Sequence, residues 1–222
     1  MLAGFAIADV AVTEEAIEIT LENGVVVTEP LSRHVTLEKA TKAQLSQWEK
    51  TPDGFGLNWP EIKPPTPDGI IDVLYCLQSS LYDAAENRWE SVGWDLTQLS
   101  TDDQQLVALY LMELEINNGG FLAFFENGGT TIYDLALAAL TRMGANDTIK
   151  LLEAMMGLIT PAITIAQSDA SRDVMEVILA TLTEQDDDAL EELEKRFWDY
   201  PENLPALVVA TYSDKVTMSN HT

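Results

Sequence analysis

The chain has 222 residues, 46% of them hydrophobic, and it carries 37 Asp and Glu against 12 Lys and Arg, a formal charge of −25. This length and composition suffice for one large or two small hydrophobic cores and argue against disorder. The charge argues against direct binding to nucleic acid or to an anionic membrane, and favours encounter with basic surfaces.

The first 64 residues predict a small β-rich domain with one helix. Hydrophobic and polar residues alternate over 15–29 and reach Asn23-Gly24 before the next apolar residues. This pattern predicts a hairpin with a two-residue turn. We also expect a strand at 5–12, one short helix within 36–50 and a returning strand at 54–62.

A proline-rich stretch then predicts a domain boundary. Pro64, Pro65 and Pro67 precede Asp68-Gly69, and neither a helix nor a central strand continues through such a run. We place a linker at 65–69, an acidic all-α domain at 70–215 and a tail at 216–222. The fold class is therefore α+β.

Apolar residues recur at helical spacing through most of 70–215, which predicts a bundle of six or seven helices. Thr101-Asp102-Asp103-Gln104 reads as a capping box at the start of one of them. The expected helices are 70–89, 106–116, 131–143, 147–159 before Pro161, 172–182, 189–200 and 204–212.

Features of cellular location are few. Cys76 is the only cysteine, so the chain forms no internal disulfide, which fits a reducing compartment. We predict that this thiol is a buried small hydrophobe. The apolar N-terminus lacks the basic leading segment of a signal peptide, and no stretch approaches the length of a membrane span. We therefore expect a cytoplasmic protein.

Residues 115–129 read EINNGGFLAFFENGG and interrupt the helical pattern with two glycine clusters. Glycine is about 1 kcal/mol less favourable than alanine inside a helix, so two clusters in fifteen residues predict two breaks. We expect one helix to end at 117–120, a short helical piece at 121–126, and release into the next helix at 127–129. Phe121, Phe124 and Phe125 then point one way, either into a core or around a ligand pocket.

The string Glu115-Ile116-Asn117-Asn118-Gly119-Gly120-Phe121, followed by Phe125 and Asn127, resembles the signature of an acidic, all-helical bacterial family that includes a DNA-mimic protein. The run LEELEKRFWDYPENLPALVVATY at 190–212 is similar to that family's closing acidic helix, aromatic pair and final helix. The similarity covers about 70–215. It implies a negatively charged surface that resembles the phosphate rows of DNA and occupies the DNA-binding surface of a basic partner such as a transcription regulator.

Residues 24–62 are similar to a second small bacterial domain of unknown function. That domain often ends in Trp-Pro followed by several acidic residues. Here Glu61 is followed by Ile62-Lys63-Pro64, so the acidic ending is mostly lost.

The negative charge lies mainly after residue 64, where 27 acidic residues face 7 basic ones, against 10 and 5 before it. The densest acidic stretch is 184–194, in which side chains four residues apart share a helix face. A solvated, well-capped helix surface is the plain alternative to a partner surface. The predicted partner-binding residues are Glu184, Asp186, Asp187, Asp188, Glu191, Glu192 and Glu194, extended by Asp102, Asp103 and Glu126.

Catalytic motifs are missing from the sequence. His34 and His221 lie in an expected loop and tail, and there is no paired cysteine, zinc-protease motif or phosphate loop. We therefore expect no enzyme, cofactor or metal site, and a basic DNA-binding protein as the partner; a homodimer stays open. The runner-up is an interaction or immunity-type module that binds through an apolar groove near Phe121–Phe125, with the acidity serving solubility only. An unrecognised hydrolase or metal-dependent enzyme ranks third.

Overall fold

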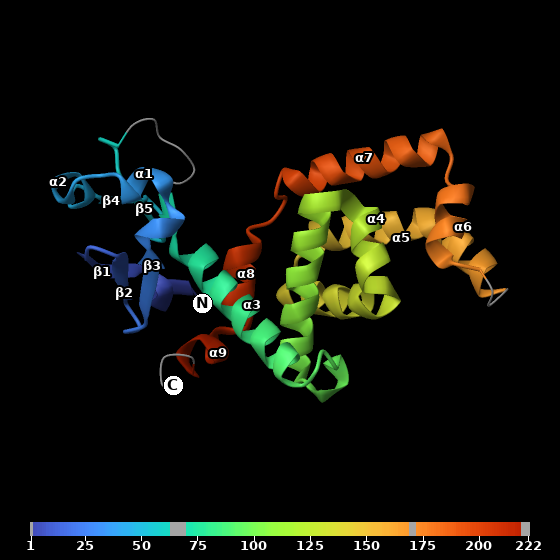
Figure 1. Ribbon diagram of the computed structural model, residues 1–222, viewed down its shortest axis with the longest axis horizontal. Coiled ribbons are helices and arrows are strands. Elements are labelled where there is room, and N and C mark those ends of the chain that lie inside the picture. The colour runs from blue at the N-terminus through green and yellow to red at the C-terminus, as the bar shows by residue number, and fades with distance from the viewer. Residues whose placement is uncertain (1, 63–69, 169–171, 219–222) are drawn as a thin grey trace. The chain divides into compact units, whose positions relative to one another are not determined.

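The structure is a computed structural model that describes residues 2–62, 70–168 and 172–218 (Figure 1). The chain divides into two compact units: Met1–Asp83 with Val208–Thr222, here the N-terminal unit, and Ala84–Leu207, here the helical unit. The first contains two small antiparallel sheets and the second is helical, which confirms the predicted α+β class. The expected linker at 65–69 lies outside the described residues.

The predicted hairpin is confirmed in the first sheet. Ile17, Ile19 and Leu21 are at most 1% exposed, whereas Glu18 between them is exposed, because alternate side chains of a strand point to opposite faces. The turn has three residues rather than two: Leu21 donates its N–H to the Val25 carbonyl at 2.8 Å. Gly24 closes this loop at φ 83°, a conformation that glycine adopts without strain. The strands pair in the order β1 (Ile7–Val12), β2 (Ala16–Leu21) and β3 (Val26–Pro30).

The expected single helix within 36–50 is wrong, since the chain forms two one-turn helices there, α1 (Val35–Glu38) and α2 (Lys42–Leu45). Thr41 starts α2, because its hydroxyl accepts from the Gln44 N–H at 3.3 Å while the Gln44 side chain accepts from the Thr41 N–H at 2.9 Å. A capping box at this point ends one turn and begins another.

A second sheet changes the predicted start of the following helix. Its strands are β4 (Glu49–Lys50), β5 (Gly56–Asn58) and β6 (Ile70–Asp72), in that order. Ile70–Asp72 was expected to be helical but pairs with the returning strand, with Ile71 opposite Leu57. The Asp72 carboxylate accepts the Leu74 N–H at 2.8 Å, and α3 (Val73–Ser91) begins there.

A buried carboxylate lies between β3 and α3 in the N-terminal unit. The Glu29 side chain is 7% exposed and lies 2.9 Å from His34 Nε2 and 3.7 Å from Arg33. The Cys76 thiol donates to Glu29 at 3.7 Å. Burial, followed by the negative charge of Glu29, raises the pKa of Cys76 to about 12. The thiol is therefore protonated at neutral pH and is a poor nucleophile.

The helical unit follows the predicted pattern of helices, with shifted ends. Ser100, rather than Thr101, caps the first long helix, because its hydroxyl accepts the Asp103 N–H at 3.2 Å. Gly144, at φ 75°, ends that helix where predicted. The helices after α3 are α4 (Thr101–Met143, broken at two glycines), α5 (Asn146–Gln167), α6 (Val174–Thr181), α7 (Glu184–Trp198), α8 (Leu204–Thr211) and α9 (Ser213–Met218), the last in the N-terminal unit.

Helix α5 continues through Pro161, where the sequence predicted an end. It is long and apolar enough to cross a membrane, and among the described residues it is the one helix of that kind. The expectation that no stretch approaches the length of a membrane span is therefore wrong. Its residues 151, 152, 155, 159, 162 and 166 are buried at helical spacing, and the helix packs against α4, α6 and α7. Polar or small residues such as Lys150, Glu153 and Gly157 are exposed. This one-sided burial is the pattern of an amphipathic helix that packs one face against the rest of a globular unit.

The raised pKa of Cys76 makes its reactivity testable. At pH 8.5 we expect the folded chain to react with iodoacetamide at least about a hundredfold more slowly than the chain in urea, since few native thiols are ionised. Glu29→Gln removes a charge that raises the pKa, so it should accelerate the native reaction. The exposed Glu22→Gln is the matched control and should not. Equal rates for the folded and unfolded chains would contradict the half-buried, protonated thiol.

Candidate functional site

Helix α4 bends twice at glycines. Gly120 has φ 80° and ψ −175°, and Gly129 has φ 60° and ψ −165°, a region that is essentially restricted to glycine. The chain therefore forms three helical segments, 101–119, 121–128 and 130–143. Both breaks predicted from the glycine clusters are confirmed. We call the bend around Gly120 the corner.

A glutamate from α7 closes the corner. Glu194 Oε1 accepts the Phe121 N–H at 3.1 Å, so it satisfies a backbone donor at the start of the second segment. A Cβ atom on Gly120 would lie 2.0 Å from the same oxygen. The Phe197 ring, one turn along α7, meets the Phe121 ring edge-on at 5.9 Å between centroids. Figure 1 shows α7 passing over this bend. Gly120 is thus required both by its conformation and by the close approach of a carboxylate.

The other residues of the family-like string have structural contacts here. Asn127 Nδ2 donates to Glu115 Oε2 at 2.7 Å, which joins the first and second segments of α4. Phe121, Phe124 and Phe125 are at most 5% exposed. They form a core beneath the bend and leave no exposed aromatic groove there. Asn117, Asn118 and Gly119 are exposed.

Helix α7 separates its acidic residues into inward and outward positions. Leu190, Leu193 and Phe197 are buried on one side, together with half-buried Glu194. Asp186 is half-buried and caps the helix with Thr183, whose hydroxyl and N–H lower the pKa of Asp186. The exposed residues are Glu184, Asp187, Asp188, Glu191 and Glu192, which we call the acidic face.

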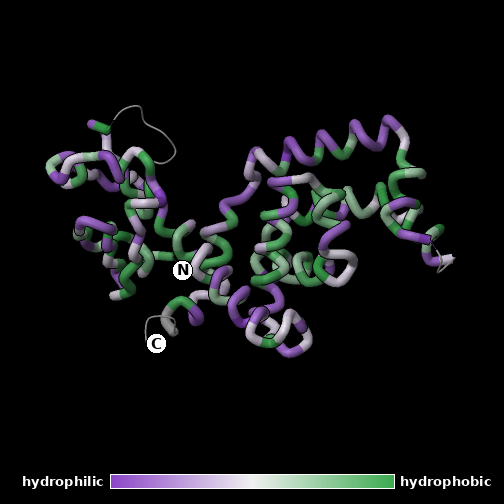
Figure 2. Tube along the Cα trace, in the orientation of Figure 1, coloured by the Kyte–Doolittle hydropathy of each residue, from purple (hydrophilic) through white to green (hydrophobic). Residues whose placement is uncertain are grey.

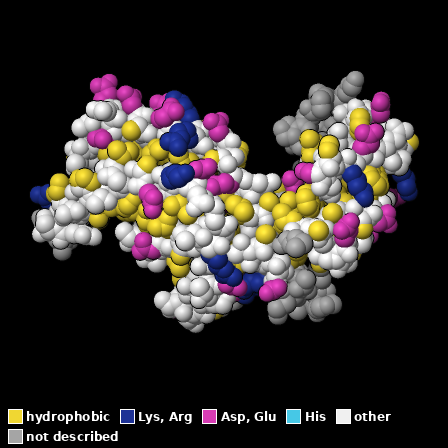
Figure 3. All heavy atoms as spheres, turned by 180° about the vertical axis from the view of Figure 1, so that it is seen from behind, with side chains coloured by type: hydrophobic (Ala, Val, Ile, Leu, Met, Phe, Trp, Pro, Cys, Tyr) yellow, Lys and Arg dark blue, Asp and Glu magenta, His cyan; other side chains and the backbone are white. Residues whose placement is uncertain are grey.

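The acidic face is dense but not unbroken. Figure 2 shows α7 as mostly hydrophilic, in contrast with α6. Lys195 Nζ lies 2.9 Å from Glu191, a contact that raises the pKa of Lys195. In the view of Figure 3, acidic side chains are scattered among apolar and basic ones. The exposed carboxylates of α7 recur at helical spacing, which makes them the candidate row.

The structure places the three outlying candidates differently. Asp103 is 5% exposed, and its carboxylate lies 2.8 Å from Arg88 and accepts from Ser100 at 2.6 Å. Asp102 lies 2.7 Å from Arg142. These two residues hold the start of α4 in place, so Asp103 is unsuited to contact a partner. Glu126 is exposed on the second segment of α4.

One structural carboxylate was missed from the sequence. Glu202 accepts the N–H groups of Asp147 at 2.6 Å and Thr148 at 2.9 Å, and also the Thr148 hydroxyl. It caps α5 from 54 residues away, because Ala145 at that helix start has no capping side chain. The absence of Ser, Thr, Asp or Asn at position 145 was the available signal.

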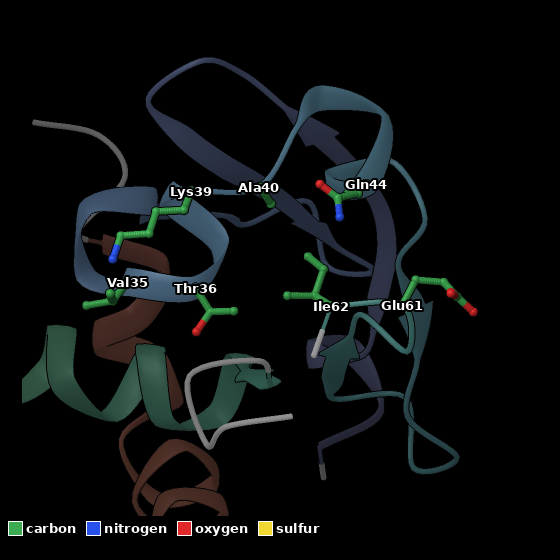
Figure 4. Close-up of a pocket in the computed structure, with 7 residues that line it drawn as sticks. All are labelled: Val35, Thr36, Lys39, Ala40, Gln44, Glu61 and Ile62. Carbon is green, nitrogen blue, oxygen red and sulfur yellow. The ribbon is translucent and has the colours of Figure 1, made fainter. Parts of the chain in front are cut away.

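The N-terminal unit contains a pocket of about 520 Å³ between α1, Gln44 and Glu61 (Figure 4). Of its polar side chains, Lys39, Gln44 and Glu61 are exposed and Thr36 is half-buried. It lacks the convergent buried polar groups of a specific small-molecule site. Among the described residues, no group of three His, Cys, Asp or Glu side chains could hold a metal ion.

These features define an acidic helical protein whose ordered structural contacts support an exposed row of carboxylates. Residues 97–216 match the family of DMP19-like proteins, and the chain belongs to this family. Membership implies a DNA-mimic protein rather than an enzyme, and suggests that it binds a DNA-binding protein. Residues 7–63 match a second family, described as a protein of unknown function (DUF2442). No curated protein and no solved structure matches the chain.

The two breaks of α4 provide a matched pair of substitutions. Gly120→Ala and Gly129→Ala both force alanine into a glycine-only conformation, at about 1–3 kcal/mol each. Nothing lies within 4 Å of a Cβ on Gly129, whereas one on Gly120 would displace Glu194. We expect Gly120→Ala to lower the free energy of unfolding in urea by about 1–3 kcal/mol more than Gly129→Ala does.

The same measurement in a Glu194→Ala background tests the cause. There the difference between the two glycine variants should largely disappear, because the displaced carboxylate is gone. Equal losses in the native background would show that the carboxylate is not what makes Gly120 necessary.

Proposed function

We propose that the acidic face of α7 mimics a row of DNA phosphates and occupies the DNA-binding surface of a basic transcription regulator. The observation that carries this proposal is that the acidic run 184–194 contains both residues that pack inward and residues that are exposed. Leu190, Leu193, Glu194 and Phe197 fix α7 on the helical unit, and five carboxylates are left exposed on the other side.

The spacing of the acidic face suits this role. Side chains at i and i+4 of a helix lie about 5–6 Å apart, on the order of the separation between neighbouring phosphates of one strand. Glu184, Asp188 and Glu192 form one such row, and Asp187 and Glu191 lie beside it. Repulsion between like charges opposes this arrangement. The Thr183–Asp186 capping box and the positive end of the helix dipole offset part of that cost.

The charge also determines what the protein avoids. A chain with −25 formal charge repels nucleic acid, so the proposed complex forms between proteins and excludes DNA from it. Long-range attraction between opposite charges speeds encounter and is weakened by salt. We place this activity in the cytoplasm, where the regulators and their DNA are found in bacteria.

The experiment is capture of bacterial proteins by the full chain at low and moderate salt, with duplex DNA as competitor. We expect a DNA-binding protein that is released both by salt and by DNA. Neutralising Asp187, Asp188, Glu191 and Glu192 to Asn or Gln should weaken its binding by on the order of tenfold or more.

The matched control neutralises four exposed glutamates of the N-terminal unit: Glu14, Glu15, Glu18 and Glu22. It changes the net charge by the same amount and should leave most of the binding intact. Two outcomes would overturn the proposal: equal losses in both variants, or capture that is indifferent to salt and DNA.

A further inference from the structure

The helical unit contains a long acidic segment without any cation. Residues 89–141 include no Lys, Arg or His, against eight Asp and Glu. Near its start, Trp94 is 52% exposed although tryptophan is among the residues that proteins bury most. Glu90 and Asp95 flank this indole in the sequence, and Asp95 is held by hydrogen bonds from the Thr97 hydroxyl at 2.6 Å and from Gln98 at 2.9 Å.

Trp94 is held in a fixed position. The Trp94 backbone N–H donates to the Trp89 carbonyl at 2.9 Å, and the Gly93 N–H donates to the Glu90 carbonyl at 2.9 Å. Together these bonds end α3 in a Schellman-type turn. The Trp94 ring meets the Trp89 ring edge-on, with 5.0 Å between centroids. A hydrophobic contact of this kind commonly accompanies the turn. It explains why an apolar residue follows Gly93, but a smaller one could make that contact without leaving half of an indole in solvent.

Two unfavourable features accompany this arrangement. Trp94 has φ 64°, a left-handed conformation that is uncommon for a bulky residue. The Trp89 Nε1 atom is buried and has no hydrogen-bond partner in the described part of the chain. Each feature disfavours folding, and such costs are concentrated at sites that contact a ligand or partner.

We propose that Trp94 is an aromatic anchor for an arginine side chain of the basic partner, with Glu90 and Asp95 supplying the complementary charge. This inference rests on the proposed function, since it specifies the chemistry of the same partner. A guanidinium group stacks on the indole face and is attracted by the electron-rich ring. Exposed tryptophans and arginines are also the residues most enriched among binding hot spots.

The arginine nearest to Trp94 in the sequence is Arg88, which forms an ion pair with another residue. Arg88 lies 2.8 Å from Asp103, a buried carboxylate. Trp94 also lies before residues 97–216, the part of the chain that matches the DMP19-like family. The anchor is therefore a property of this chain that the family match does not supply.

Trp198 provides an internal comparison. It is 43% exposed at the end of α7, but Lys195 and Arg196 lie three and two residues before it in the sequence. If exposure alone attracted arginine, both tryptophans would respond equally. Asp199 follows Trp198 as Asp95 follows Trp94, so the two settings differ mainly in the nearby cations, and we expect Trp94 to respond more strongly than Trp198.

The test follows the indole N–H signals of the full-length, ¹⁵N-labelled protein by NMR during titration at low salt. The probes are capped peptides of six arginines and of six lysines. The Trp94→Phe variant identifies its signal among the five tryptophans. We expect the arginine peptide to shift the Trp94 signal saturably and the Trp198 signal much less.

Affinity measurements with Trp94→Leu complete the test. The variant should bind the arginine peptide about two- to fivefold more weakly, the range of an exposed cation–π contact, and should lose less affinity for the lysine peptide, whose ammonium groups do not stack on the ring. Unchanged signals of the three indoles other than Trp89, whose ring contacts Trp94, establish that the variant is folded. An unmoved Trp94 signal, equal shifts of Trp94 and Trp198, or no binding of the arginine peptide would each overturn the inference.

The outcome for the acidic face is separate. If neutralising α7 weakens both peptides while Trp94 stays unmoved, the anchor fails and the acidic face stands. If Trp94 responds but neutralising α7 has no effect on either peptide, the anchor stands and the acidic face fails.

Discussion

The helical unit depends on a carboxylate from one helix that binds the backbone of another. Glu194 accepts the Phe121 N–H where α4 bends, and the bend leaves no room for any side chain at position 120. Glycine there would otherwise only weaken a helix. The contact links the two parts of the chain that resemble the family, 115–127 and 190–212. One interaction therefore accounts for Gly120 in the first part and for Glu194 in the second.

This contact also determines how α7 presents its charge. Because Glu194 and Phe197 lie on one side of the helix, the rotation of α7 about its axis is fixed, and the five carboxylates of the acidic face point to solvent. Burial of Leu190 and Leu193 favours the same orientation, and the Glu194 hydrogen bond adds a specific polar contact to it. Acidic residues that are close in this run therefore differ in role: Glu194 packs against the corner, and the five residues of the acidic face are exposed to solvent.

The sequence was sufficient where local chemistry decides structure. Alternation and Asn23-Gly24 predicted the hairpin, and the glycine clusters predicted both breaks of α4. It was insufficient where distant contacts decide. Ile70–Asp72 became a strand because β5 offers pairing, and Asp103 and Glu194 are structural because their partners come from elsewhere in the fold. Glu202 was missed for the same reason: Ala145 indicates that a cap is missing, but nothing local points to a residue 54 positions away from Thr148.

The boundary between the compact units does not coincide with the boundary of the family match. Residues 97–216 include Val208, Val209 and Tyr212, which are at most 2% exposed and belong to the unit built on residues 1–83. A gene fragment cut at the family boundary would separate these apolar residues from that unit and leave them a liability for aggregation. The family match is therefore not a compact unit by itself: its residues from Val208 onward belong with residues 1–83 rather than with the rest of the match.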